Sequence, residues 1–202
     1  MGNFNEKSKA AYNKKADDYD NTLDGKFTRK FKQLLIENIT LEDNQNVLDV
    51  ACGNGSLLAL LNQRKSINGY GIDVSDQMIK NAANNNSNMD FHVSGCEAMP
   101  FDNDSMDIMT VCAAYHHFPD VAAFAREAKR VLKTNGTLYI ADVYLSAFLR
   151  LIINPFVPLS KDGDVKFYSP KEIINNFNPL GFERVGVKII SNIQFISMKL
   201  NK

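Results

Sequence analysis

Five short apolar runs alternate with helical segments in the middle of the chain, and this alternation limits the fold more than any other feature. The runs are Val47–Ala51, Gly69–Asp73, Met89–Val93, Met106–Cys112 and Thr137–Val143. Such alternation predicts a parallel sheet with helices on both faces. Two further β-rich runs, Phe182–Ile190 and Ile193–Leu200, are separated by only two residues, which requires an antiparallel hairpin. The sequence therefore predicts an α/β fold with a seven-stranded, mainly parallel sheet and an antiparallel C-terminal hairpin.

The remaining segments complete one domain spanning residues 1–202, because this length suits a single core. Residues 1–40 are expected to form an N-terminal helical cap, since Tyr12, Ala16 and Tyr19 recur at helical spacing. The longest apolar stretch, Leu145–Leu159, is interrupted by Arg150 and two prolines, so it is too short and broken to span a bilayer. Further on, Ser169 to Glu172 has the pattern of a capping box at a helix start.

The charge balance and the cysteines exclude several function classes. The chain has 23 basic and 23 acidic residues, so it lacks the broad positive field of a nucleic-acid-binding protein. Its 3 cysteines have no paired spacing, which argues against a disulfide framework or a cysteine metal site and favours a cytoplasmic location.

A glycine-containing turn follows the first strand, and an acidic residue ends the second. Gly53 and Gly55 would let a ligand approach the backbone, although a tight strand-to-helix turn also requires small residues. Asp73 can accept both hydroxyls of a ribose, although it can equally begin the helix after Ser75. Together, in this order, they favour an adenosine-bearing cofactor.

The charges near this turn distinguish between adenosine cofactors. A dinucleotide favours a third glycine where Leu58 stands, and its pyrophosphate would lie near the Asp49 carboxylate. S-adenosylmethionine has no phosphate, and an aspartate attracts its sulfonium and ammonium groups. The sequence therefore favours S-adenosylmethionine over NAD.

Several stretches resemble the class I S-adenosylmethionine-dependent methyltransferases, in their small-molecule, ubiquinone-biosynthesis-like branch. VLDVACGNGSLL (residues 47–58) resembles motif I, and YGIDVSDQMIKNA (70–82) resembles the second strand and its acidic end. Residues 92–120 and 127–142 are similar to the adenine-binding, fourth-strand and fifth-strand regions, and residues 10–20 to the N-terminal helix. The resemblance implies a Rossmann-like fold, with residues 144–168 as a substrate lid.

The resemblance also implies roles for individual residues. Asp49, Ala51, Gly53 and Gly55 would surround the methionine part of the cofactor, and Asp73 would hold the ribose. The other implied cofactor-binding residues are Tyr12, Tyr19, Val74, Met78, Gly95, Cys96, Glu97 and Cys112. Two positions depart from the usual pattern. Ala51 replaces a glycine, which a negative φ would tolerate, and Gly95 stands where an aspartate often meets the adenine.

Two adjacent histidines follow the fourth strand at the predicted cofactor mouth. Either His117 or His116 can take a proton from an acceptor, although both can also simply shape the pocket. In an extended segment their side chains would point to opposite sides, so no metal site is expected. His92 lies inside the third strand and is expected to be structural.

The sequence predicts a methyltransferase for a small-molecule acceptor, and the apolar side chains in residues 144–168 suggest an apolar one. Those side chains can equally form an oligomer contact or pack in the core, so a homodimer is left open. Arg150 and Lys161 could meet an anionic acceptor. The alternatives are an S-adenosylmethionine-binding protein without catalysis and, less favoured, an NAD-dependent oxidoreductase.

Overall fold

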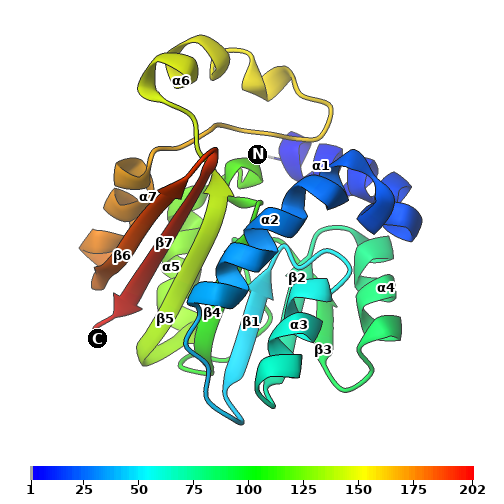
Figure 1. Ribbon diagram of the computed structural model, residues 1–202, viewed down its shortest axis with the longest axis vertical. Coiled ribbons are helices and arrows are strands. Elements are labelled where there is room, and N and C mark those ends of the chain that lie inside the picture. Colours follow the sequence, from blue (N-terminus) through cyan, green and yellow to red (C-terminus); the bar gives the residue numbers. More distant parts are fainter. Residues whose placement is uncertain (1) are drawn as a thin grey trace.

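A seven-stranded sheet forms the centre of the protein in a computed structural model, which describes residues 2–202 (Figure 1). The strand order is β3-β2-β1-β4-β5-β7-β6. The strands are β1 Asn46–Val50, β2 Asn68–Asp73, β3 Asp90–Val93, β4 Met106–Cys112, β5 Leu132–Val143, β6 Phe182–Ile190 and β7 Ile193–Leu200. The first five strands are parallel, and β7 is antiparallel to both β5 and β6. The predicted fold is therefore confirmed.

Helices cover both faces of the sheet, with α2 and α3 on one side and α5 and α7 on the other (Figure 1). The α-helices are α1 Gly2–Lys15, α2 Leu23–Asn38, α3 Ser56–Arg64, α4 Asp76–Asn85, α5 Val121–Val131, α6 Ala147–Ile153 and α7 Pro170–Phe177. Four short 3₁₀ turns are η1 Ala16–Asn21, η2 Tyr115–His117, η3 Val157–Leu159 and η4 Asn178–Leu180. No helix within residues 2–202 is long and apolar enough to cross a lipid bilayer.

Alternate residues of the central strands pack into two cores. In β1, Val47 joins the core beneath α2 and α3, whereas Leu48 joins the core beneath α5 and α7. This alternation follows from the period of two in a strand. Because both faces are buried, β1 and β4 are mostly apolar, and the polar pair inside them, Asp49 and Thr110, is joined by a hydrogen bond.

The N-terminal helical prediction needs one correction. The stripe of Tyr12, Ala16 and Tyr19 does not lie on one helix, because α1 ends at Lys15 and the 3₁₀ turn η1 follows, with a kink at Asp18 (φ −128°). The next helix then starts at its own N-cap, where the Thr22 hydroxyl accepts a hydrogen bond from Gly25 N at 3.0 Å. The N-cap at Thr22 therefore determines where α2 begins, and the apolar spacing does not.

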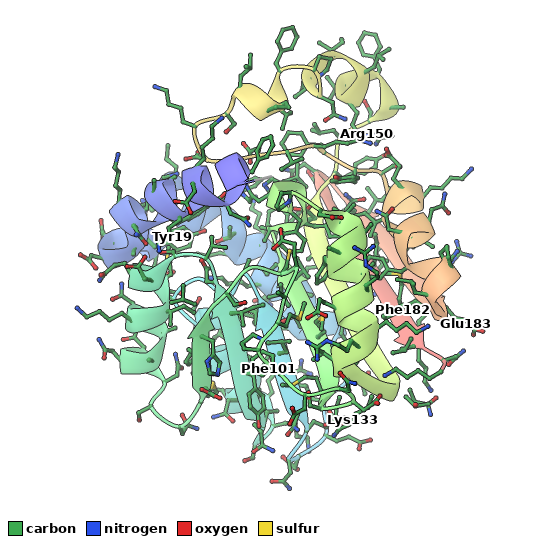
Figure 2. All side chains as sticks on the ribbon, turned by 180° about the vertical axis from the view of Figure 1, so that it is seen from behind. Tyr19, Phe101, Lys133, Arg150, Phe182 and Glu183 are labelled. Atoms are coloured by element: carbon green, nitrogen blue, oxygen red, sulfur yellow. The ribbon has the colours of Figure 1, made fainter. Side chains whose placement is uncertain are left out.

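Residues 144–168 form a separate layer beside α1, with α6 projecting away from the sheet (Figures 1 and 2). Phe148 and Leu151 are 71% and 76% exposed, and no residue of α6 is buried. The alternative that these side chains pack in the core is therefore wrong for α6, although Val157, just after the helix, is buried. The predicted capping box at Ser169 is confirmed, since its hydroxyl accepts from Glu172 N and the Glu172 carboxylate accepts from Ser169 N.

Candidate functional site

A cleft opens where β1, β2 and β4 end, and the loops that follow these strands line it. The empty space inside it, which is continuous with solvent, is about 700 Å³. The lining residues are Asn5, Ser8, Tyr12, Tyr19, Val50, Ala51, Gly53, Ile72, Asp73, Val74, Met78, Ser94, Cys96, Cys112, Ala113, Ala114, His117 and Phe118. Among these described residues there is no lysine or arginine. The cleft therefore has no fixed positive side chain to hold a phosphate group.

The turn after β1 brings its backbone to the edge of this cleft. Gly53 has a φ of +54°, and a Cβ placed there would meet no atom within 4 Å, so the space beside it is open. Ala51 has a φ of +59°, which contradicts the expectation of a negative φ at this position. Ala113, after β4, also has a positive φ of 52°. Left-handed geometry costs a non-glycine residue roughly 1–2 kcal/mol. Ala51 and Ala113 therefore carry backbone strain at the cleft wall.

Asp73 ends β2 and faces the same opening. Its carboxylate oxygens accept hydrogen bonds from Gly53 N and Ser75 N, each at 2.9 Å. Burial nevertheless raises the pKa of Asp73 above its usual value, although these backbone donors lower it. The two interpretations of Asp73 are compatible in this geometry, because the side chain braces the start of α4 while lining the cleft.

Asp49 lies beneath the first turn rather than in the wall of the main cleft. It lines a smaller adjoining cavity together with Tyr19, Ala51, Gly53 and Cys112, all of which also line the main cleft. Its Oδ1 accepts a hydrogen bond from the Thr110 hydroxyl at 2.6 Å. Burial raises the pKa of Asp49 to about 7, against the opposing effects of that hydrogen bond and of Lys32, which lines the same cavity.

The residues predicted for the adenine end are only partly brought together. Val74, Met78 and Cys96 line the main cleft, whereas Gly95 and Glu97 do not. A Cβ at Gly95 would lie 2.5 Å from Glu97 Oε2, so the glycine makes room for that carboxylate. Gly55 is also outside the lining. It is the N-cap of α3 with a φ of +76°, and a Cβ there would lie 2.9 Å from Asn86 Nδ2. Its role in the structure is therefore a tight turn.

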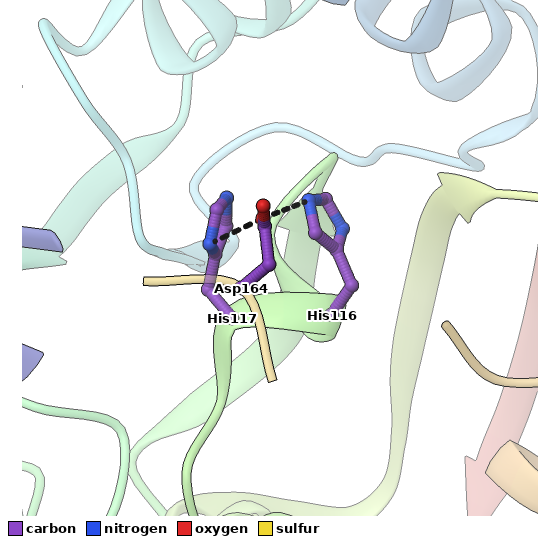
Figure 3. Close-up of side chains that lie close together, drawn as sticks. All are labelled: His116, His117 and Asp164. Carbon is purple, nitrogen blue, oxygen red and sulfur yellow. Dashed lines mark ion pairs between the residues drawn. The ribbon is translucent and has the colours of Figure 1, made fainter. Parts of the chain in front are cut away.

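His116 and His117 lie on the 3₁₀ turn η2, not on an extended segment, so their rings do not point to opposite sides. The ring centroids are 4.2 Å apart with planes at 38°. Asp164, from the segment after α6, lies between them, with Oδ1 3.1 Å from His117 Nδ1 and 3.5 Å from His116 Nε2 (Figure 3). The geometric argument against a shared ligand is therefore wrong.

Two further groups contact this pair from the opposite sides. His116 Nδ1 lies 2.6 Å from Asp142 Oδ1, and His117 Nε2 lies 3.1 Å from the Tyr12 hydroxyl. Burial and the neighbouring His116 lower the pKa of His117 to about 4, so His117 is neutral at pH 7. Burial lowers the pKa of His116, but Asp142 and Asp164 outweigh burial and raise it.

A second cleft adjoins the first and shares Tyr12, Tyr19, Ala113 and His117 with it. The rest of its lining mixes apolar and acidic side chains: Asp24, Phe27, Thr28, His116, Val143, Asp162, Asp164 and Phe167. Lys15 pairs with both Asp24 and Asp162 at 2.8 Å. Arg150, on α6, donates a hydrogen bond to Leu145 O (Figure 2). Neither Arg150 nor Lys161 lines this cleft, contrary to a role in binding an anionic acceptor here. An excess of carboxylates disfavours an anionic ligand here.

Sequence reasoning missed several residues of the two clefts. Asn5 and Ser8 enter from α1, and Ser94 follows β3, without any motif to single them out. Asp142 and Asp164 are distant from the histidines along the chain, and only the path of residues 144–168 brings Asp164 to them. His92 lines neither cleft, and its Nε2 lies 3.0 Å from Asp90 Oδ2 in an exposed ion pair.

Comparisons with known proteins agree with this geometry. Residues 48–140 match the family described as a methyltransferase domain. An uncharacterised protein, MJ1252 of Methanocaldococcus jannaschii, is 33% identical over 139 residues, which cover 67% of this chain and 52% of that protein. A demethylmenaquinone methyltransferase of Thermotoga maritima is 27% identical, covering 76% of this chain and 77% of that protein. The chain thus spans about half the length of the first of these relatives.

Among solved structures, a putative methyltransferase of Haloferax volcanii, in complex with the Trm112 methyltransferase activator, superposes with a TM-score of 0.83. The match covers 95% of this chain and 98% of that one at 19% identity, so it supports the fold alone. On the fold, the sequence motifs and these matches, the chain is similar to the class I S-adenosylmethionine-dependent methyltransferases of the ubiquinone-biosynthesis type.

Proposed function

We propose that this protein transfers a methyl group from S-adenosylmethionine to a small, neutral and largely apolar acceptor held in the second cleft. The observation that carries the proposal is the charge of the main cleft: Asp73 lies in its wall and none of its described lining residues is a lysine or arginine, while Asp49 lies beneath it in a cavity that Lys32 also lines. A sulfonium and an ammonium group gain from such surroundings, whereas a pyrophosphate does not.

The cofactor fits the residues present. Asp73 would accept the ribose hydroxyls, Val74 and Met78 would flank the adenine, and Asp49 would face the ammonium group. The open space beside Gly53 leaves room for the ligand against the backbone. When bound, S-adenosylmethionine supplies an electrophilic methyl group. The chain's own task is then to align the acceptor and exclude water from the junction of the clefts.

The reacting group of the acceptor would lie beside His117, whose imidazole lines both clefts. Because its pKa is lowered to about 4, His117 is neutral at pH 7 and a weak base, so its expected role is to orient the acceptor together with the Tyr12 hydroxyl, which lies 3.1 Å from His117 Nε2. Phe27, Val143 and Phe167 offer an apolar surface, and the carboxylates in the wall would repel an anion. The demethylmenaquinone-methylating relative supports an aromatic ring as the acceptor type.

Residues 144–168 are proposed as the lid over this acceptor. Asp162, Asp164 and Phe167 from this segment line the second cleft, while α6 above them has no buried residue. The exposed apolar side chains of α6 are consistent with an entry path for an apolar molecule.

A thermal-shift comparison tests the cofactor first. At about 100 times the Kd, a ligand stabilises the folded state by about 2.7 kcal/mol, which raises the Tm of a domain this size by about 5–10 °C. We expect that shift with S-adenosylmethionine and S-adenosylhomocysteine and none with NAD. A shift with NAD alone would refute the proposal.

Turnover is then measured as S-adenosylhomocysteine formed with a panel of hydroquinones and phenols, each paired with a carboxylated analogue. We expect product with the neutral members and much less with the anionic ones. Cofactor binding with no turnover on either set would favour the non-catalytic alternative.

A further inference from the structure

We propose that His116, His117 and Asp164 form a binding site for one divalent transition-metal ion, at the wall between the two clefts. This site goes beyond the proposed methyl transfer, which needs no metal ion.

The three donor atoms already lie close to the spacing of a ligand set. One atom from each side chain lies within 4.8 Å of the others. Asp164 Oδ1 is 3.1 Å from His117 Nδ1 and 3.5 Å from His116 Nε2 (Figure 3). Tetrahedral ligands that each lie about 2.0–2.1 Å from zinc are separated by roughly 3.3 Å. The carboxylate is therefore correctly spaced from both imidazoles, and a small rotation of one ring completes the set.

One of these atoms has no hydrogen bond to satisfy it. His117 Nδ1 is fully shielded from solvent and lacks a hydrogen-bond partner within the described chain. Its 3.1 Å separation from Asp164 lacks the alignment of a hydrogen bond. A buried polar nitrogen of this kind is uncommon and costly. A metal ion between the nitrogen and the carboxylate would satisfy both.

The outer contacts resemble those that orient metal-binding histidines. Asp142 Oδ1 accepts a hydrogen bond from His116 Nδ1 at 2.6 Å, which turns the lone pair of Nε2 toward Asp164. A carboxylate behind a ligating histidine commonly fixes its tautomer and raises its basicity. On the other side, the Tyr12 hydroxyl meets the far nitrogen of His117. The two carboxylates, Asp142 and Asp164, together match the charge of one divalent cation.

The backbone holds the three ligands in place without an ion. Both histidines lie on the single turn η2. The irregular segment that carries Asp164 is tied to the same turn, because Val165 N and Lys166 N donate to His116 O at 2.8 and 3.2 Å. The ligands are therefore largely preorganised.

The donor set selects the class of ion. Two imidazole nitrogens and one carboxylate suit zinc, iron(II), cobalt(II) or nickel(II), whereas magnesium and calcium prefer oxygen ligands. Three protein ligands leave at least one coordination position free. All three side chains line the second cleft, so that position would face an acceptor with a hydroxyl or carbonyl oxygen.

The test uses the full chain after chelator treatment, titrated separately with Zn²⁺ and Co²⁺. We expect one ion per chain, and visible Co²⁺ bands typical of nitrogen and oxygen ligands without a thiolate band. Asp164→Asn and His117→Gln are each expected to weaken binding by about tenfold or more. The matched control is His92→Gln, which removes the exposed histidine paired with Asp90 and should leave binding unchanged.

Circular dichroism and the melting curve of each variant establish that it is folded. Equal Zn²⁺ affinity in the wild type, Asp164→Asn and His117→Gln would overturn the proposal, as would a wild type that binds neither ion. That second result would leave Asp164 only as a carboxylate beside the two imidazoles. The S-adenosylmethionine thermal shift, measured with and without chelator, keeps the two proposals apart, because it should persist without metal.

Discussion

Replacing Asp73 by asparagine is expected to weaken S-adenosylmethionine binding by about 1.5–3 kcal/mol, or roughly 10–150-fold in Kd, the range for hydrogen bonds to a charged group. The carboxylate already accepts one backbone N–H on each oxygen, from Gly53 and Ser75. Each oxygen retains a lone pair for a ribose hydroxyl. Asparagine has similar size, but it lacks the charge and one of the two acceptors.

The same substitution has a calculable effect on stability. The asparagine NH₂ group would face the N–H of either Gly53 or Ser75, so one buried donor loses its partner. The cost is about 1–3 kcal/mol, which lowers the Tm of a domain this size by roughly 2–12 °C. The variant is therefore expected to stay folded at 20 °C and to be suitable for binding measurements.

Isothermal calorimetry with S-adenosylmethionine and S-adenosylhomocysteine measures the loss. The matched control is Asp76→Asn, the same chemical change three residues along, at a side chain that is 58% exposed and outside the cleft lining. It should bind like the wild type. If folded Asp73→Asn binds as tightly as that control, Asp73 does not hold the cofactor, and the ribose assignment is refuted.

Three further predictions follow from burial and capping. The pKa of Asp49 is about 7 in the ligand-free protein, and a cation favours its ionised form, so cofactor affinity should rise about fivefold from pH 6 to pH 7. Because this pKa is raised, ligand-free stability should fall as the pH rises from about 4 to about 7. Calorimetry and pH-dependent urea unfolding of Asp49→Asn should show a smaller change in both, and the remainder should come from Asp73, whose pKa burial also raises. Ser169→Ala removes the N-cap of α7 and should cost about 1 kcal/mol in urea unfolding. Phe177→Ala, at a fully buried ring, should cost about 3–5 kcal/mol, whereas Phe148→Ala on the exposed face of α6 should change stability by less than about 0.5 kcal/mol.

Local signals in the sequence predicted most of the fold. The strands and the hairpin across Ser191 and Asn192 follow from apolar patterning and connection length, which act over a few residues. The capping box at Ser169 is equally local. The kink at Asp18 was missed because the apolar spacing continues through it while the backbone leaves the helix.

The candidate site was predicted less completely, because it depends on contacts between distant segments. Asp164 reaches the two histidines only through the path of residues 144–168, which no local pattern specifies. The positive φ of Ala51 likewise depends on the turn as a whole and not on the preference of alanine. Tyr12 and Tyr19, which the family resemblance supplied, do line the main cleft despite the break between them.

The choice of S-adenosylmethionine over a dinucleotide follows from how burial acts on the acids around the first turn. Burial raises the pKa values of both Asp49 and Asp73, and the nearby Lys32 offsets only part of this effect at Asp49, so the ionised forms remain unfavourable without a ligand. A positively charged ligand removes part of that penalty on binding, whereas a pyrophosphate would add to it. The packing acts in the same direction, because Leu58 is fully buried where close helix–strand packing in a dinucleotide site favours glycine. Charge and shape thus select the same ligand independently, so a variant that removes both acids should bind S-adenosylmethionine more weakly in calorimetry and should still not bind NAD.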